Sequence, residues 1–222
     1  MICIKKILLL ASSLLFFALS GSLSAQQLTH FIQDKSSAKF LKDAAGLLIT
    51  DKGQVLITST RKGTLLVLEN DKFKHLNLKP SIFKKTALAG IAQMADGSLV
   101  IVNASSNKIA ITDENAGKLT RIFSRSGGDA GEIKSSKGVA VSINNRIYVA
   151  DKSNNRISVF NEQGLFFQQF GREGKSQTDL SKPSHIALDA EENVYVLESE
   201  SKNRVSIFTS KGILIKQIKA KQ

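Results

Sequence analysis

Four oxygen-bearing side chains recur along the chain and are the first candidates for chemistry. They stand where a short apolar run ends and a polar turn begins: Ser59, Asn103, Asp151 and Glu198. Arg156 and Arg204 follow the two carboxylates after the turn, and Lys108 holds the same place after Asn103. A carboxylate and a guanidinium across one turn can form a charge-assisted pair. The four side chains are therefore either stabilisers of their turns or ligands on one face.

Other kinds of chemistry are poorly represented. The only cysteine, Cys3, lies near the N-terminus, so the rest of the chain offers no thiol nucleophile and no cysteine-bound zinc site. The glycine loop at residues 171–174 follows an apolar run instead of opening a helix, which is not the context of a phosphate-binding loop. There is no serine nucleophile elbow. The sequence therefore predicts no catalytic residue, no metal site and no cofactor.

The candidates belong to an internal repeat. Copies begin at Gly46, Gly90, Gly138 and His185, in steps of 44, 48 and 47 residues. Each copy holds four short segments rich in Val, Ile and Phe, bounded by Gly, Asn, Asp or Ser, which are strand and hairpin signals. Four strands in a unit of roughly 40–50 residues indicate β-propeller blades. A two-sheet sandwich would explain the strands, but not the recurring Asn-Arg and Gly positions.

Two copies carry a specific resemblance. Residues 137–171 contain Tyr-Val-Ala-Asp and Asn-Arg-Ile-Ser-Val-Phe, and residues 182–218 contain Pro-Ser-His-Ile-Ala and Asn-Arg-Val-Ser-Ile-Phe. Both copies resemble NHL repeats, and the copies from Leu88 and Ala44 match more loosely. The resemblance implies an all-β, NHL-type β-propeller with four visible four-stranded blades at 44–87, 88–135, 136–181 and 182–222.

NHL-like propellers usually have six blades, which leads to a further expectation. Residues 26–43 are predicted to form an N-terminal outer strand, at 27–33, and a linker. Because the last visible blade already has its own outer strand at 213–218, the N-terminal strand would belong to a blade that the four repeats do not supply. We therefore expect an incomplete six-bladed ring that self-associates through open blade edges.

Two enzyme comparisons follow from the resemblance. NHL-like amidating lyases bind a metal at the propeller centre. Our alignment places His30 and His75 on outer strands and only His185 on an inner strand, so the histidines do not share a site. Gluconolactonase-like propellers use acidic and amide ligands around the axis, where this chain offers one charged group, Asp189. That is a thin ligand set for a hard cation, and a metal-dependent hydrolase or lyase of either type remains the alternative function.

The N-terminal sequence has the pattern of a secretory signal peptide. Lys5 and Lys6 precede an apolar run at 7–19, and small residues follow at 21–25. The run is shorter than the ~20 residues that span a bilayer, although an uncleaved anchor stays open. We expect cleavage near Ala25, export to the periplasm or the medium, and no transmembrane span in the mature chain. The expected division is a signal peptide at 1–25, a linker at 26–43 and the propeller at 44–222.

Net charge and compartment together predict the kind of partner. The formal charge of +12 falls to about +10 without the signal, which favours acidic partners. Export disfavours nucleic acid and leaves an anionic polymer or an acidic protein face. The predicted function is therefore an exported binding or scaffold module that recognises a protein or an anionic polymer, with binding favoured over catalysis. Its candidate binding residues are His185, Asp189, Asp151, Glu198 and Asn103, with a structural role favoured for the strand-end residues because they recur with the repeat.

Overall fold

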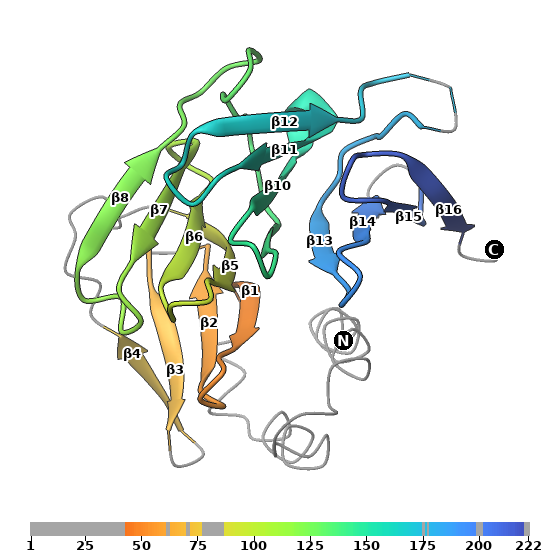
Figure 1. The fold of residues 1–222 in the computed structure, drawn as a ribbon. Helices are drawn as coiled ribbons and strands as arrows, with labels where there is room; N and C mark the ends of the chain where they lie inside the picture. The colour runs from red at the N-terminus through yellow and green to blue at the C-terminus, as the bar shows by residue number, and fades with distance from the viewer. Residues whose placement is uncertain are drawn as a thin grey trace.

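A computed structural model describes residues 43–60, 63–69, 72–76, 87–174, 176, 178–198 and 202–219. In these residues the regular structure is β-strand, apart from one short 3₁₀ turn, η2 (Lys152–Asn154). The strands form four antiparallel four-stranded sheets, each continuous in the sequence (Figure 1). The predicted N-terminal strand at 27–33, with His30, lies outside the described residues.

Each sheet is one blade, with its strands in chain order from the axis outward. Blade 1 contains β1 (Ala44–Ile49), β2 (Val55–Ser59), β3 (Leu65–Glu69) and β4 (Lys72–Leu76). Blade 2 contains β5 (Leu88–Gln93), β6 (Leu99–Asn103), β7 (Lys108–Thr112) and β8 (Leu119–Phe123). Blade 3 contains β9 (Val139–Val141), β10 (Ile147–Asp151), β11 (Arg156–Phe160) and β12 (Phe166–Phe170). Blade 4 contains β13 (His185–Leu188), β14 (Val194–Glu198), β15 (Arg204–Phe208) and β16 (Leu214–Lys219).

The burial of the strands explains their sequences. Every residue of β6, β10 and β11 is buried, because a neighbouring blade covers each face of the sheet. Strands that are covered on both faces have nearly continuous apolar sequences. Leu-Val-Ile-Val in β6 and Ile-Tyr-Val-Ala in β10 follow this rule. The outer strands β8 and β12 are mostly exposed and mix polar with apolar residues. The predicted fold class, an all-β propeller of four-stranded blades, is confirmed.

The hydrophobic core lies between successive blades rather than in one central mass. One cluster joins blades 1 and 2 around Leu65 and Ile101, a second joins blades 2 and 3 around Val102 and Ile147, and a third joins blades 3 and 4 around Tyr148 and Phe208. Aromatic pairs extend the last two joints outward. Each blade is therefore stabilised mainly by the faces of its neighbours, as in other repeat architectures.

Glycine sets the spacing of the blades at the axis. A Cβ on Gly46 would stand 2.5 Å from the carbonyl oxygen of Ala89, and one on Gly90 would stand 2.5 Å from that of Lys137. On Gly138 it would stand 2.8 Å from the Cα of His185. Each glycine thus meets the backbone of the next inner strand, and side chains have no room there. His185 occupies the equivalent place on blade 4 and is exposed.

This spacing predicts that alanine has unequal effects on stability at two equivalent positions. Gly90→Ala should destabilise the protein by about 1–3 kcal/mol, because the added methyl group overpacks a joint of backbone against backbone. His185→Ala, its counterpart on blade 4, should change stability by less than about 0.5 kcal/mol, as expected for an exposed position. Urea unfolding followed by circular dichroism measures both values. Equal losses at the two positions would contradict the axial packing described here.

Candidate binding face and the clamps that shape it

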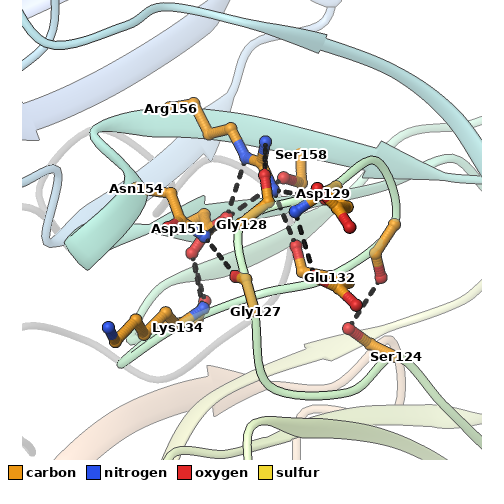
Figure 2. A network of polar contacts seen from close by, with 12 residues as sticks. Ser124, Gly127, Gly128, Asp129, Glu132, Lys134, Asp151, Asn154, Arg156 and Ser158 are labelled. Carbon is orange, nitrogen blue, oxygen red and sulfur yellow. Dashed lines mark hydrogen bonds and ion pairs between the residues drawn. The ribbon is translucent and has the colours of Figure 1, made fainter.

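Asp151, at the end of β10, is the centre of a buried polar network (Figure 2). Its carboxylate is completely buried. Oδ1 accepts the backbone N–H of Lys134 at 2.7 Å, and Oδ2 accepts Asn154 Nδ2 at 2.8 Å and Arg156 Nε at 2.9 Å. The hydroxyl of Ser136 lies 3.4 Å from Oδ1, and the hydroxyl of Ser158 lies 3.4 Å from Oδ2. The carboxylate is thus bonded on all sides by its own chain.

The guanidinium of Arg156 carries the network into the segment between blades 2 and 3. Nη1 donates to the carbonyl of Gly128 at 2.9 Å, and Nη2 donates to the carbonyls of Asp129 and Glu132 at 2.8 and 2.9 Å. These carbonyls belong to the connector that leads from β8 to β9. Together Asp151 and Arg156 form what we call a clamp: an ion pair on blade 3 that holds the connector entering blade 3.

Blade 4 repeats the clamp with a longer acid. Glu198 is completely buried, and its Oε1 lies 2.7 Å from Arg204 Nε and 2.8 Å from Ser206 Oγ. Its Oε2 accepts the backbone N–H of Ser181 at 2.8 Å, and Arg204 Nη2 donates to the carbonyl of Asp179 at 2.6 Å. The ion pairs expected from the sequence are therefore present in both blades, and each reaches further than its own turn.

Blades 1 and 2 carry reduced versions. Asn103 is buried at the end of β6 and accepts the backbone N–H of Ser106 at 3.2 Å, which closes its own turn. Lys108, which replaces the clamp arginine, is exposed. Ser59 is buried at the matching end of β2. The strand-end residues Asp151, Glu198 and Asn103 are thus enclosed, and a ligand could reach them only if their turns opened.

A second ion pair, which the sequence interpretation missed, braces each of the two connectors that enter blades 3 and 4. Arg125 Nε lies 2.6 Å from Glu132 Oε1, and Arg172 Nε lies 3.3 Å from Asp179 Oδ1. The detectable signal was an Arg followed seven residues later by an acid in both connectors. The backbone N–H of Asp129 and then the Arg125 guanidinium hold the pKa of Glu132 below its usual range. The pKa of Asp179 is likewise lowered, first by the backbone N–H of Ser176.

These lowered pKa values predict an acid-sensitive connector. A carboxylate with a lowered folded-state pKa stabilises the fold fully above the ordinary carboxyl range, near about pH 4, and this stabilisation is lost as the pH falls through the folded pKa. The free energy of unfolding of the wild type should therefore fall more steeply below about pH 4 than that of Glu132→Gln. Denaturant titrations at several pH values measure this difference. Parallel curves for the two proteins would refute it.

The two other predicted binding residues lie at opposite ends of β13. His185 begins the strand, on the face that carries the connectors, and its Nδ1 lies 3.2 Å from Ser184 Oγ. Asp189 follows the end of the strand and lies in the turn to β14. The structure therefore brings His185 to the same side as the clamps and separates Asp189 from them. His75 lies on the outer strand β4, as expected.

Asp189 is held by its own turn. Its Oδ2 accepts Asn193 Nδ2 at 2.9 Å and the Tyr195 hydroxyl at 3.1 Å, and its Oδ1 accepts the backbone N–H of Asn193 at 2.7 Å. Burial acts to raise the pKa of Asp189, but these hydrogen bonds outweigh it and the pKa lies below the usual range. Gln93, at the matching place on blade 2, bonds to Asp51 of blade 1. Within the described ranges no three His, Cys, Asp or Glu side chains converge on a metal position.

Charge is divided between the two loop faces of the propeller. The connector face bears the connectors and the turns between second and third strands. Its exposed or half-exposed lysines are Lys108, Lys134, Lys137, Lys152, Lys182 and Lys202. The clamp and brace arginines are paired with acids there, which leaves Asp43, Asp129 and Glu173 as the remaining acidic groups on the described part of this face.

The opposite face, which we call the hairpin face, bears the turns between first and second and between third and fourth strands. Its acids are Asp51, Asp96, Asp113, Glu114, Glu162, Asp189, Glu191 and Glu192. Its cations are fewer in the described residues: Lys52, Lys118, Arg146 and Lys211. Lys52 pairs with Glu114, and Arg146 stacks over the ring of Phe167. In the described residues, positive charge is therefore in excess on the connector face and negative charge on the hairpin face.

The clamp makes a stability prediction. Asp151→Ala should destabilise the protein by about 3–5 kcal/mol, because it leaves the buried guanidinium of Arg156 without its counter-ion. Asp129→Ala, in the clamped connector but with an exposed side chain, is the matched control and should change stability by less than about 0.5 kcal/mol. Chemical denaturation gives both values. A loss for Asp151→Ala no larger than that of the control would show that the clamp does not stabilise the fold.

Four-stranded antiparallel blades arranged side by side about an axis define a β-propeller, and the comparisons with known proteins agree. Residues 128–219 match the sequence model of the family DUF5128, described as a 6-bladed beta-propeller. The described residues supply four blades. No curated protein matches the chain in sequence. Among the described residues no helix is long and apolar enough to cross a membrane.

Solved propellers share the fold at low sequence identity. A catalytically inactive virginiamycin B lyase from Staphylococcus aureus, crystallised with Quinupristin, superposes with a TM-score of 0.61 at 20% identity, over 80% of this chain and 56% of the lyase. A protein of unknown function from Bacteroides caccae gives 0.59 at 10% identity, over 80% and 61% of the two chains. Hydrazine synthase from Kuenenia stuttgartiensis gives 0.59 at 12% identity, over 79% and 48%. The chain spans little more than half the length of the lyase.

Proposed function

We propose that this chain is an exported, NHL-type β-propeller that binds an anionic partner, a polymer or an acidic protein surface, with its connector face. One observation carries the proposal: most acids of the connector face are paired with arginines in the clamps and braces, while its lysines are exposed or half-exposed. The face therefore carries an excess of exposed positive charge in the described residues.

The rigidity of this face supports a binding role. Each clamp ties a connector to a fully buried strand end, so the lysines of the connectors stand on a fixed frame. A frame that is ordered before binding loses little conformational entropy when a partner docks. Charged groups spread over such a face accelerate association and bind through many weak contacts, each of them screened by salt.

The NHL assignment is supported by the part that its signature residues play. The Asn-Arg pair at the start of the third strand supplies a left-handed turn residue, Asn155 with φ 53°, and then the clamp guanidinium of Arg156. Blade 4 uses Asn203, with φ 45°, and Arg204 in the same way. Asn tolerates this conformation better than most residues, which gives the repeated dipeptide a physical reason.

The alternative, a metal-dependent hydrolase or lyase, has weaker support. The likeness to a lyase is a likeness of fold. Asp189, the carboxylate that the sequence offered near the axis, is already hydrogen bonded to Asn193 and Tyr195. Turnover of a lactone or lyase substrate that EDTA abolishes would support this alternative over binding.

Binding to a defined polyanion tests the proposed function. The protein should bind immobilised dextran sulfate in low salt and elute as salt is raised. A variant with Lys108→Glu, Lys134→Glu and Lys137→Glu should elute at clearly lower salt, with an affinity reduced at least about tenfold if each reversal costs roughly 0.5 kcal/mol or more.

The matched control reverses charges on the other face. Lys118→Glu with Lys211→Glu, both on the hairpin face, should leave the elution nearly unchanged after allowance for net charge. Equal effects of the two sets would show that net charge, and not the connector face, determines binding.

The proposal of export has its own test. Protein recovered from the producing cells should lie outside the cytoplasm and begin near Gln26, because the Lys5–Lys6 start and the apolar run direct secretion. N-terminal sequencing and fractionation measure both. Full-length chain found in the cytoplasm would overturn the proposal.

A further inference from the structure

The two connectors that enter blades 3 and 4 contain the same closed loop. The carbonyl oxygen of its first residue, Arg125 or Arg172, accepts the backbone N–H that follows the brace acid, at 3.0 Å in both loops. The acid, Glu132 or Asp179, accepts the arginine Nε–H at 2.6 and 3.3 Å, respectively. Its other carboxylate oxygen accepts a backbone N–H from the middle of the loop, at 3.0 and 2.6 Å. One local sequence pattern thus builds the same structure twice.

A glycine near the start of each loop makes room for the acid. A Cβ on Gly127 would overlap Oε2 of Glu132 (Figure 2), and a Cβ on Gly174 would overlap Oδ2 of Asp179. The glycine loop at 171–174, which opens no helix, therefore has a structural part in the connector. It seats the acid that holds the arginine.

The guanidinium of each brace lies on the outside of its loop. The side chains of Arg125 and Arg172 are 79% and 82% exposed, whereas those of Glu132 and Asp179 are 12% and 5% exposed. Nε is the atom bonded to the acid, and the Nη groups of both arginines have no hydrogen-bond partner among the described residues. Each guanidinium is therefore fixed at one edge and free at the other, where both Nη groups can donate to one oxyanion.

The two guanidiniums hold equivalent positions at successive joints between blades. Asn107 Oδ1 of blade 2 accepts the Ser135 N–H, and Asn155 Oδ1 of blade 3 accepts the Lys182 N–H, both at 2.8 Å. The same bond thus fixes each connector to the blade before it. A linear polyanion repeats its charged groups along one chain, so it meets the same contact twice. Its second contact is intramolecular once the first has formed.

We propose that Arg125 and Arg172 are the selective contacts of the connector face, and that each presents its free Nη edge to a sulfate or carboxylate group of one linear polyanion that crosses both joints. The contact rests on the connector-face binding proposed above and adds the chemistry of the partner to it. The lysines of the face act as point charges, whereas a guanidinium binds an oxyanion through two parallel N–H bonds. The lysines then supply attraction, and the arginines supply preference.

Arginine-to-lysine changes test the contact because they keep the net charge. Arg125→Lys and Arg172→Lys should each weaken binding to dextran sulfate or to polygalacturonate at least about threefold, because lysine cannot form the bidentate contact. The double variant should lose at least about tenfold, since the two contacts act on one polymer chain. Loss on the first polymer identifies sulfate as the preferred oxyanion, and loss on the second identifies carboxylate.

The matched control is an arginine without a brace. Arg121 is exposed on the outer strand β8, which leads into the first loop. Arg121→Lys should leave the affinity for either polymer within about twofold of the wild type, as expected for an exposed cation whose charge is kept. Circular dichroism and thermal melting confirm that each variant is folded.

Chemical modification tests the contact in the wild type, without any substitution. Phenylglyoxal reacts with exposed guanidiniums, and mass spectrometry locates the modified residues. The bound polymer should slow the modification of Arg125 and Arg172 but leave that of Arg121 unchanged.

The outcomes separate this contact from the proposed function. If the triple lysine reversal weakens binding while both arginine variants bind each polymer like the wild type, the lysines act alone and the arginine contact is wrong. Equal losses for Arg121→Lys would also overturn it. Arginine-dependent binding to ovalbumin, an acidic protein, with both polymers unaffected, would assign the contact to a protein surface and overturn the polyanion. A wild type that binds neither polymer in low salt would overturn both proposals.

Discussion

The buried ion pair at the end of the second strand of blades 3 and 4 is the interaction on which the arrangement of their connectors depends. Asp151 with Arg156, and Glu198 with Arg204, are enclosed by apolar strands, where an unpaired charge would be severely destabilising. Their remaining hydrogen-bond capacity is directed at backbone groups of the incoming connector. A connector is long and irregular, and its carbonyls need partners. The clamp therefore orders the connector and satisfies the buried charges with the same bonds.

The close spacing of neighbouring inner strands at the axis is the second constraint. Gly46, Gly90 and Gly138 let each inner strand approach the next so closely that a Cβ would overlap backbone atoms. Turn residues add polar links between blades: Asn107 Oδ1 accepts the Ser135 N–H, and Asn155 Oδ1 accepts the Lys182 N–H, both at 2.8 Å. Replacement of the glycine by His185 on blade 4 changes what can pack there.

The sequence was sufficient to predict the blades because their signals are local and repeated. Strand boundaries followed from apolar runs between turn residues, and the ion pairs followed from Asp151–Arg156 and Glu198–Arg204 standing across one turn. The sequence did not show where the guanidiniums point, because their carbonyl partners lie in the irregular connector that enters the same blade, 24–28 residues before Arg156. Nor did it separate Asp189 from the clamps, since the two ends of one short strand differ by four residues in sequence but lie on opposite faces.

The division of charge between the faces follows from the same construction. A four-stranded antiparallel blade presents its first and third hairpin turns at one end, and its second hairpin turn together with the connector at the other. Tight hairpin turns favour Asp, Asn and Gly, because short polar side chains bond to their own backbone, and Asp189 shows this directly. The connectors instead need carbonyl partners, which arginines supply while neutralising the acids around them. Acids accumulate on the hairpin face because tight turns favour short polar side chains. On the connector face, most acids are neutralised by ion pairs with arginines. The exposed lysines there then determine the sign of the field that an approaching molecule meets.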